Sequence, residues 1–346
     1  MMKRFYKIGA ATLIIGLILT IAGYINGGLQ PVVGTDLTNF QVLDAKTFSH
    51  TRTLSYKKFS QVELNTGEVD YRIHRGNKYQ IKVNDTKEHL LVVNKVKDKI
   101  VIGQRHQTYP ITIDWKFYKQ RPEVEITVPT KAALTKIEDN NTQGSLKVSD
   151  LNLKKLIVDI ADYNEQDDLQ LHNLQVERAQ ISTDMSDTDI DNCTFNNSKF
   201  DLDNCVLEMN KLVVKKKLVA NIVGGDFETY SSEFHHGKIS DSDGEVLINK
   251  SIVDTMKFSL DQVDLNMSRN KFTGKNTFGL KQSSLIMKHN PANINYDLLT
   301  TGEGQIKFRG KKVHRSSANY TKFNKKVANS VGTIKAEASD DDIVIK

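Results

Sequence analysis

A sequence period of about nineteen to twenty residues is the feature that most constrains the fold of this chain. Between Leu146 and Met287, apolar residues recur in groups, and the steps between group starts are 23, 19, 19, 20, 19, 19 and 20 residues. The groups start at Leu146, Leu169, Thr188, Leu207, Phe227, Val246, Leu265 and Leu285. A fixed period of this size is typical of solenoids, in which each coil buries its apolar face only against its neighbours.

Within a group, the apolar positions fall at offsets 0, 2, 5, 7, 10 and 12. Steps of two indicate strands, whose successive side chains point to opposite faces, and the steps of three indicate corners. An amphipathic helix would instead repeat at i, i+3, i+4 and i+7. The spacing predicts an all-β fold: a single-stack parallel β-solenoid of very short strands, with β caps at its ends. In the fourth group it places Lys217 and Val219 at the last two inward positions.

Two other repeat folds have a similar local pattern. A leucine-rich-repeat horseshoe needs Asn or Cys at a fixed place after its leucines, which the groups do not show. The stretch from Cys193 to Phe200 resembles the pentapeptide-repeat family, but over barely two pentads. Neither pattern extends over the repeated region.

The N-terminus predicts a membrane anchor. Ile8 to Ile25 is an uncharged run of eighteen residues, preceded by Lys3, Arg4 and Lys7, and the next basic residue is Lys46. Such a run approaches the span of a bilayer core, and the charge asymmetry predicts a cytoplasmic N-terminus with the rest of the chain outside the cell. A cleaved signal peptide is the alternative, with small residues at Thr20 and Ala22.

The sequence suggests six segments. We expect a cytoplasmic tail at 1–7, a transmembrane anchor at 8–25 and a juxtamembrane linker at 26–55. An N-terminal β region or cap at 56–130, the solenoid at 131–310 and a C-terminal β segment or cap at 311–346 follow.

Charge and cysteine content narrow the functional classes. The formal net charge is +6, and three of those charges precede the apolar run, so we expect no nucleic-acid binding. Cys193 and Cys205 are the only cysteines. A disulfide between them is possible in an oxidising compartment. Cys193 occupies an inward position and Cys205 falls past the periodic positions, which favours buried free thiols.

Several motifs together resemble a known family. They are Phe59-x-x-Val62-x-Leu64, Val69-Asp70-Tyr71-x-Ile73-x-x-Gly76, Val124-Glu-Ile126-Thr-Val128-Pro129 with Leu134-x-x-Ile137, Thr300-Thr-Gly302-x-Gly304-x-Ile306, and Ser330-Val-Gly332-Thr-Ile334. Over about residues 56–346 the chain is similar to the putative-adhesin domain of unknown function of membrane-anchored bacterial envelope proteins, mainly of Gram-positive bacteria. Gln143-Gly144-Ser-Leu146 and Asp243-Gly244-Glu-Val246 stand in for the family's Gly-Asp-Ile motif. The resemblance implies a β-solenoid outside the membrane, an adhesive or envelope role and no catalytic residues.

Carboxylates are the first candidates for a site. Asp187, Asp189 and Asp191 alternate on one strand face and are candidate Ca²⁺ ligands, since Ca²⁺ takes six to eight oxygens. A solvated outer face with Asp- and Asn-rich corner turns is the favoured explanation, because no complete calcium loop accompanies them. Asp241-x-Asp243-Gly244 is only a fragment of such a loop. We therefore expect no metal, no cofactor and no catalytic residues.

Other polar groups have ordinary explanations. His235-His236 would point to opposite faces of a strand, which disfavours a shared metal. Lys215-Lys-Lys217 and Lys311-Lys312 could contact anionic wall polymers, although short charge runs are usually solvated.

The sequence leaves three functions open. It favours a membrane-anchored extracellular module for binding, adhesion or envelope scaffolding, with an envelope polymer or an envelope or membrane protein as partner. A carbohydrate-active lyase or hydrolase using residues such as Asp189 or Asp203 is the alternative, on fold analogy alone. An envelope-stress accessory protein is the third.

Overall fold

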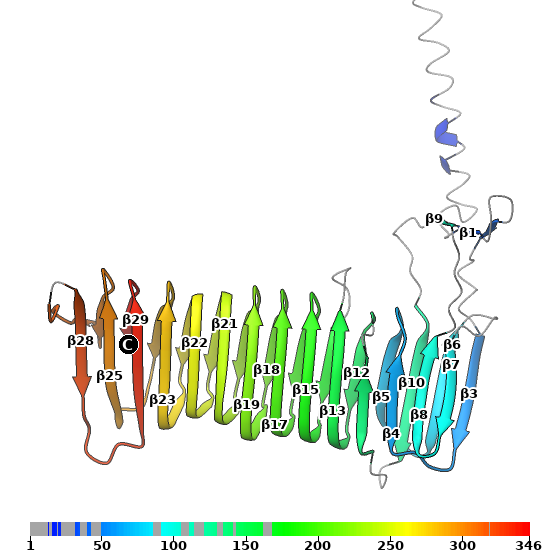
Figure 1. Cartoon of the computed structure of the whole chain (residues 1–346), viewed down its shortest axis with the longest axis horizontal. Coiled ribbons are helices and arrows are strands. Elements are labelled where there is room, and N and C mark those ends of the chain that lie inside the picture. The colour runs from blue at the N-terminus through cyan, green and yellow to red at the C-terminus, as the bar shows by residue number, and fades with distance from the viewer. Residues whose placement is uncertain are drawn as a thin grey trace, which may run out of the picture.

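The computed structural model describes residues 13, 16–18, 20–21, 32–34, 40–42, 50–85, 91–104, 111–113, 121–129, 134–140, 143–161, 168–317 and 319–346. Figure 1 shows a long stack of β-coils that runs from blue N-terminal strands to orange and red C-terminal strands. From β11 (Lys136–Asp139) through β24 (Ser284–Lys288), coils pair in parallel with their neighbours, so the predicted parallel β-solenoid is confirmed.

Each regular coil contains one short and one long strand. The short strands form one wall of the stack: β12 (Leu146–Ser149), β14 (Asp168–His172), β16 (Asp187–Asp191), β18 (Val206–Asn210), β20 (Asp226–Tyr230), β24, β26 (Ile306–Phe308) and β30 (Ile343–Ile345). The other wall is formed by the four-residue β11 and by the long strands β13 (Asn152–Ala161), β15 (Gln175–Asp184), β17 (Thr194–Asp203), β19 (Val213–Val223), β23 (Lys271–Lys281), β25 (Ile294–Thr301) and β29 (Gly332–Ser339). β21 (Glu233–Asn249) and β22 (Ile252–Ser268) run through both walls.

The long strands replace the very short ones that the sequence predicts. In β15 the exposed pair Glu177 and Arg178 separates the buried Val176 from the buried Ala179. Two consecutive outward residues break strand alternation, so the strand bends there without ending. Each coil therefore has three straight segments: the short strand and the two arms of the bent long strand.

The interior consists of rows of side chains that repeat from coil to coil. Nearly all predicted inward positions are buried, with Lys217, Val219 and the half-buried Gly237 as exceptions. A further buried row lies fourteen or fifteen residues after each group start: Ile160, Thr183, Leu202, Ile222, Asp241, Leu260 and Leu280. Rings stack along the axis where aromatic residues occupy adjacent coils, as for Phe258 and Phe278 at 4.7 Å between centroids. Like side chains in register give the long, continuous core expected of a solenoid.

The predicted inward positions Lys217 and Val219 are wrong. Leu218 and Ala220 are fully buried, whereas Lys217 is exposed. The pairing of β17 with β19 shifts register after Phe195, because β19 carries one extra residue at its bend. This β-bulge moves the following inward residues along by one.

Residues of the predicted N-terminal cap already belong to the stack. β4 (Gln61–Asn65) and β5 (Asp70–Gly76) pair in parallel with β11 and β12, so the first coil begins seventy residues before the expected start at 131. Antiparallel pairing closes this end through β3 (His50–Tyr56), β6 (Tyr79–Asp85), β7 (Leu91–Val96), β8 (Lys99–Gln104) and β10 (Glu123–Pro129). Closure of this kind protects a sheet edge.

A small antiparallel sheet involves part of the expected linker at 26–55. It contains β1 (Val32–Gly34) paired with β2 (Phe40–Val42) and with β9 (Ile111–Ile113). β3 also begins inside that range, at His50. These strands differ from the expectation of an irregular linker.

The C-terminal coil does not lie at the end of the stack. β29 pairs in parallel with β23 on one side and with β25 on the other, and β30 lies likewise between β24 and β26. Figure 1 shows β29 in red between β23 and β25. The antiparallel strands β28 (Tyr320–Lys325) and β27 (Lys311–Lys312) cover the outermost coil. The predicted C-terminal segment at 311–346 thus contributes both a cap and an internal coil.

Most of the predicted anchor Ile8–Ile25 lies outside the described residues. Those described there, Leu13, 16–18 and 20–21, are helical, and the Thr20 hydroxyl donates to the Gly16 carbonyl at 2.8 Å. Within the described part of the chain, no helix is both long and apolar enough to cross a membrane.

Candidate binding surfaces

The outer side of the short-strand wall is acidic. Outward carboxylates follow one another over six coils; this acidic wall comprises Asp168, Asp187, Asp189, Asp191, Glu208, Asp226, Glu228, Glu245 and Asp264. Because successive coils pair in register, residues far apart in the sequence become direct neighbours, as in the column from Asp189 through Glu208 to Glu228.

Carboxylates at the start of the short strands have a structural role. Asp187 accepts the backbone N–H of Val206 at 3.3 Å, and Asp226 accepts that of Glu245 at 3.0 Å. In both cases the acceptor lies nineteen residues before the donor, one coil away. A charged acceptor for the first amide of the next short strand explains why Asp recurs here.

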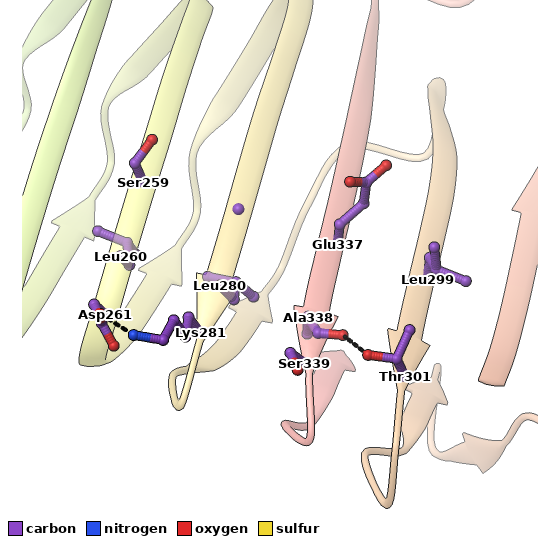
Figure 2. Close-up of a pocket in the computed structure, with 11 residues that line it drawn as sticks. Ser259, Leu260, Asp261, Leu280, Lys281, Leu299, Thr301, Glu337, Ala338 and Ser339 are labelled. Atoms are coloured by element: carbon purple, nitrogen blue, oxygen red, sulfur yellow. Dashed lines mark hydrogen bonds and ion pairs between the residues drawn. The ribbon is translucent and has the colours of Figure 1, made fainter. Parts of the chain in front are cut away.

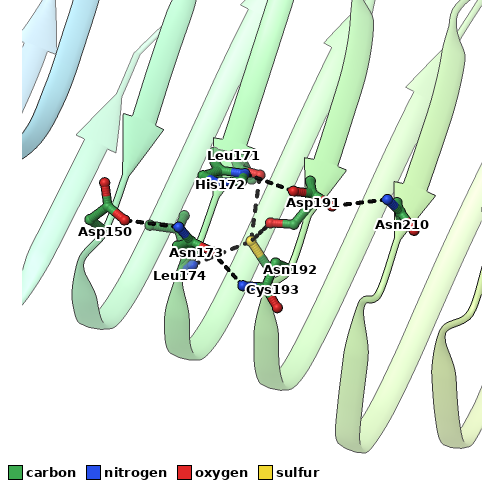
Figure 3. Close-up of polar contacts among 9 residues, drawn as sticks. All are labelled: Asp150, Leu171, His172, Asn173, Leu174, Asp191, Asn192, Cys193 and Asn210. Carbon is green, nitrogen blue, oxygen red and sulfur yellow. Dashed lines mark hydrogen bonds and ion pairs between the residues drawn. The ribbon is translucent and has the colours of Figure 1, made fainter.

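The other two calcium candidates have different surroundings. Asp191 binds the His172 imidazole at 2.9 Å and accepts from the Asn210 amide at 3.0 Å, as Figure 3 shows. No described side chain donates a hydrogen bond to Asp189. Desolvation by burial raises the pKa of Asp189, with the charges of Asp191 and Asp168 adding to the effect and His172 opposing it.

These positions do not assemble a metal cage. Within the described residues, no group of three or more His, Cys, Asp or Glu side chains is placed to hold a metal ion. The calcium hypothesis for Asp187, Asp189 and Asp191 stays a prediction. The two aspartates of the calcium-loop fragment at 241–244 do not lie together, because Asp241 is buried in the core and Asp243 is exposed at a corner with φ +62°.

Corners of the coils carry residues with positive φ and polar side chains. Asp150, Asn173 and Asn192 have φ between 51° and 59° at the corner after the short strand. Asn173 donates to Asp150 at 2.9 Å, and Asn192 donates to Asn173 (Figure 3). Asn and Asp tolerate the left-handed conformation, so this ladder combines backbone fit with contact between coils.

Cys193 lies at the inner side of the same corner. Its sulfur accepts the Leu174 N–H at 3.4 Å, and its thiol lies 3.3 Å from the Asp191 carbonyl (Figure 3). Burial raises the pKa of Cys193 to about 12. The predicted free, buried state of both cysteines is confirmed. The thiol is a hydrogen-bonding group of the corner as well as a small apolar residue.

Later coils use hydroxyl and amide side chains at the position of Cys193. Ser232 Oγ accepts the Leu212 N–H at 3.0 Å, Ser251 Oγ accepts the Ser232 N–H at 3.1 Å, and Asn270 Oδ1 accepts the Ser251 N–H at 2.8 Å. These buried side chains satisfy corner amides that would otherwise lack acceptors. The nineteen-residue spacing of small polar residues was the sequence signal, although it did not indicate their role.

Cys205 belongs to a repeated row, contrary to its predicted place past the periodic positions. Ser186, Cys205, Gly225, Gly244, Val263 and Ser283 follow each other at nineteen or twenty residues. Cys205 is buried, and its sulfur lies 3.4 Å from the Thr183 hydroxyl. A Cβ on Gly225 would lie 2.1 Å from the Cys205 carbonyl oxygen, so the coils approach too closely for a side chain.

The His235-His236 pair lies at the bend of β21. His235 contacts Asp254 at 3.3 Å and Glu233 at 3.7 Å. His236 is exposed with φ +57°. Among the described residues, these two histidines are not part of any group of side chains placed to hold a metal ion.

The long-strand wall carries a shallow depression of about 550 Å³ near the C-terminal coils (Figure 2). It lies over β22, β23, β29 and β25 where Gly279 and Ala338 leave space between larger neighbours. Lys281 pairs with Asp261 at 2.7 Å, and the Thr301 hydroxyl donates to the Ala338 carbonyl at 3.4 Å. Leu299 gives it one apolar side. Several of its polar groups are thus engaged, since Glu337 also pairs with Lys335 at 2.6 Å.

The residues of the catalytic alternative face outward from different strands. Asp189 lies on β16, whereas Asp203 ends β17 and accepts from its neighbour Asn204 at 3.0 Å. Neither lines the depression near the C-terminus. The geometry offers extended rows of polar side chains, and such rows suit long ligands or protein surfaces.

Comparison with known proteins identifies the family. The family model described as Toastrack DUF4097 matches residues 59–346, which include every strand from β4 to β30. The chain belongs to the Toastrack DUF4097 family. This confirms the predicted family of domains of unknown function, whereas a Gram-positive origin stays a prediction. No curated protein matches the Toastrack chain.

Solved structures resemble this Toastrack chain at low sequence identity. A putative adhesin from Parabacteroides distasonis ATCC 8503 shares 6% identity with a TM-score of 0.48, and a putative lipid binding protein from the same organism shares 8% with 0.43. In both comparisons 86% of this chain and 96% of the other are covered. A putative cell adhesion protein from Clostridium sporogenes ATCC 15579 shares 12%, with a TM-score of 0.20 and coverage of 86% and 98%.

Proposed function

We propose that this Toastrack domain is displayed outside the cell by an uncleaved anchor at Ile8–Ile25 and acts as a binding, adhesion or envelope-scaffolding module. The observation that supports it best is the register of the outward positions. Each coil adds one residue to each outward row, so the walls present long polar surfaces, and the depression over β22, β23, β25 and β29 is shallow. Extended surfaces of this kind are used by solenoids for binding.

The display part of the proposal rests on the charge-flanked apolar run, and thiol labelling tests it. Ser55 is exposed on β3, so a Ser55→Cys variant offers an accessible thiol. Both native cysteines are buried with raised pKa values, which keeps them unreactive and the background low. We expect a membrane-impermeant maleimide to label Ser55→Cys in intact cells.

A matched control fixes the orientation. Lys3→Cys, on the other side of the apolar run, should react only after the cells are opened. Labelling of Lys3→Cys alone in intact cells would invert the proposed topology. The binding part is tested by incubating the purified full chain with envelope fractions, and failure to retain any wall polymer or envelope protein would refute the adhesive role.

A further inference from the structure

The bend of the long strands collects cations from seven consecutive coils. We call this set the basic ridge; it comprises Lys154, Lys155, Arg178, Lys199, Lys215, Lys216, Lys217, Lys238, Lys257 and Lys275. All ten side chains are exposed. They come from β13, β15, β17, β19, β21, β22 and β23, so every coil from β13 to β23 contributes at least one.

Pairing between coils aligns six of these ten residues in two adjacent rows. Lys155 is the register partner of Arg178, which leads through Asn197 to Lys217. Lys199 leads through Val219 to Lys238 and Lys257. Since neighbouring strands lie about 4.8 Å apart, seven coils extend the ridge over roughly 29 Å. In the sequence the ridge residues are scattered, with short lysine runs only at 154–155 and 215–217, whereas the fold brings all ten to the same side of the stack.

Few carboxylates neutralise this line. Among the described residues, Lys199 is the one ridge cation in an ion pair, with Asp201. The two carboxylates at the bend are Glu177 and Asp254, and Asp254 already contacts His235. The acidic wall lies on the short-strand segment, and in a coil of three segments the bend between the other two lies across from it. The modest net charge of +6 therefore conceals a separation of charge across the stack.

We propose that the basic ridge binds a linear polymer of phosphodiesters lying along the solenoid axis. Nine of its ten cations are lysines, whose ammonium groups contact phosphate oxygens as point charges and do not need the fixed bidentate geometry of Arg, which suits a flexible chain of phosphates. A flexible chain can place one anion near each coil. This inference rests on the proposed display of the domain and names the chemistry of its partner.

The composition of the ridge argues against other anionic partners. Single-stranded nucleic acid is bound by aromatic stacking platforms, and a membrane surface by apolar side chains that enter the interface. The exposed large hydrophobic residues of the described chain, among them Met185, Val206 and Val223, all lie off the ridge. Polar neighbours such as Asn197 and Thr277 flank the cations instead.

The test measures binding of the purified full chain to fluorescent poly(glycerol phosphate) at several salt concentrations. Simultaneous Lys215→Gln, Lys216→Gln and Lys217→Gln should weaken binding about tenfold or more and flatten the dependence of log K on log salt, because fewer counterions are released. The matched control carries Lys311→Gln, Lys312→Gln and Lys326→Gln, which remove three exposed charges elsewhere. It should change affinity less than about twofold.

Three outcomes would overturn the ridge proposal. They are an equal loss in both triple variants, an unchanged affinity in the ridge variant, and tighter binding of the wild type to oligothymidine or to phosphatidylglycerol vesicles at equal phosphate concentration. The proposed function fails separately. If Ser55→Cys is not labelled in intact cells while ridge-dependent polymer binding persists, display is refuted and the ridge proposal stands. If Ser55→Cys is labelled and envelope binding survives in the ridge variant, display stands and the ridge proposal is refuted.

Discussion

Asp241 is a carboxyl group in an apolar row, and its substitution gives a quantitative prediction. Its row neighbours are Ile222 in the preceding coil and Leu260 in the following one. It is 4% exposed, and neither carboxyl oxygen has a hydrogen-bonding partner of good geometry. Burial raises its pKa from 3.8 to about 7, the nearby charges of Asp226 and Asp243 add to this, and the Ser242 amide opposes it only partly.

The sign of the effect follows from linkage between protonation and folding. Below pH 4 the carboxyl is protonated in the folded and unfolded chains, so it costs no stability through ionisation. Between pH 4 and 7 the unfolded chain ionises first, and stability falls as pH rises. Above pH 7 the cost is complete. A shift of about 3 pKa units at 1.36 kcal/mol each corresponds to about 4 kcal/mol.

Asp241→Asn removes the charge and keeps the shape. Relative to the wild type, we expect its free energy of unfolding in urea to rise from no difference at pH 4 to about 4 kcal/mol at pH 8. Asp241→Leu, which matches Leu260, should be at least as stable because it also removes the unpaired polar atoms. Asp203→Asn, an exposed carboxyl in an earlier coil, is the control and should show no such trend. A difference between Asp241→Asn and the wild type that does not vary with pH would refute the reasoning.

Three further substitutions test the register and the corners. Leu218→Ala should cost about 2–5 kcal/mol in urea unfolding because Leu218 is fully buried, whereas Lys217→Ala should cost almost nothing; the opposite order would restore the register read from the sequence. Ser251→Ala should lower stability by about 1–3 kcal/mol by leaving the Ser232 N–H without its acceptor, and Ser251→Cys should recover part of it; equal stability of wild type and alanine variant would contradict this. Gly244→Ala should lower the melting temperature, because its Cβ would lie 1.9 Å from a carbonyl oxygen of the preceding coil; an unchanged midpoint would show that the coils can separate there.

The periodic core was predictable from the sequence because each coil repeats the same inward positions. The offsets identified Leu169, Phe195 and Val253 as core residues, and all are buried. Apolar spacing no longer predicts the inward residues where the period changes. Three consecutive lysines at 215–217 carry no apolar signal, so the extra residue of the β19 bulge cannot be located from spacing alone.

Positions fixed by pairing over long distances were not predictable. The sequence of β29 (Gly332–Ser339) predicts an ordinary eight-residue strand, and only its pairing with β23 and β25 determines its place in the stack. The short-strand carboxylates were found, whereas their bonds to amides one coil away depend on exact register. Part of the basic ridge was predictable, because the repeat spacing places Lys155, Arg178 and Lys216 nine residues after their group starts, although the β19 bulge puts Lys217 in that column in the structure.

The internal position of the C-terminal coil sets the order in which the domain can be completed. β29 and β30 are the last strands in the sequence, yet they separate coils made of residues 271–288 and 294–308. Coils cannot simply be added in the order of synthesis, since β23 and β24 keep an open edge until residues 332–345 arrive. During synthesis this edge therefore stays open to chaperones and proteases until residues 332–345 have left the ribosome.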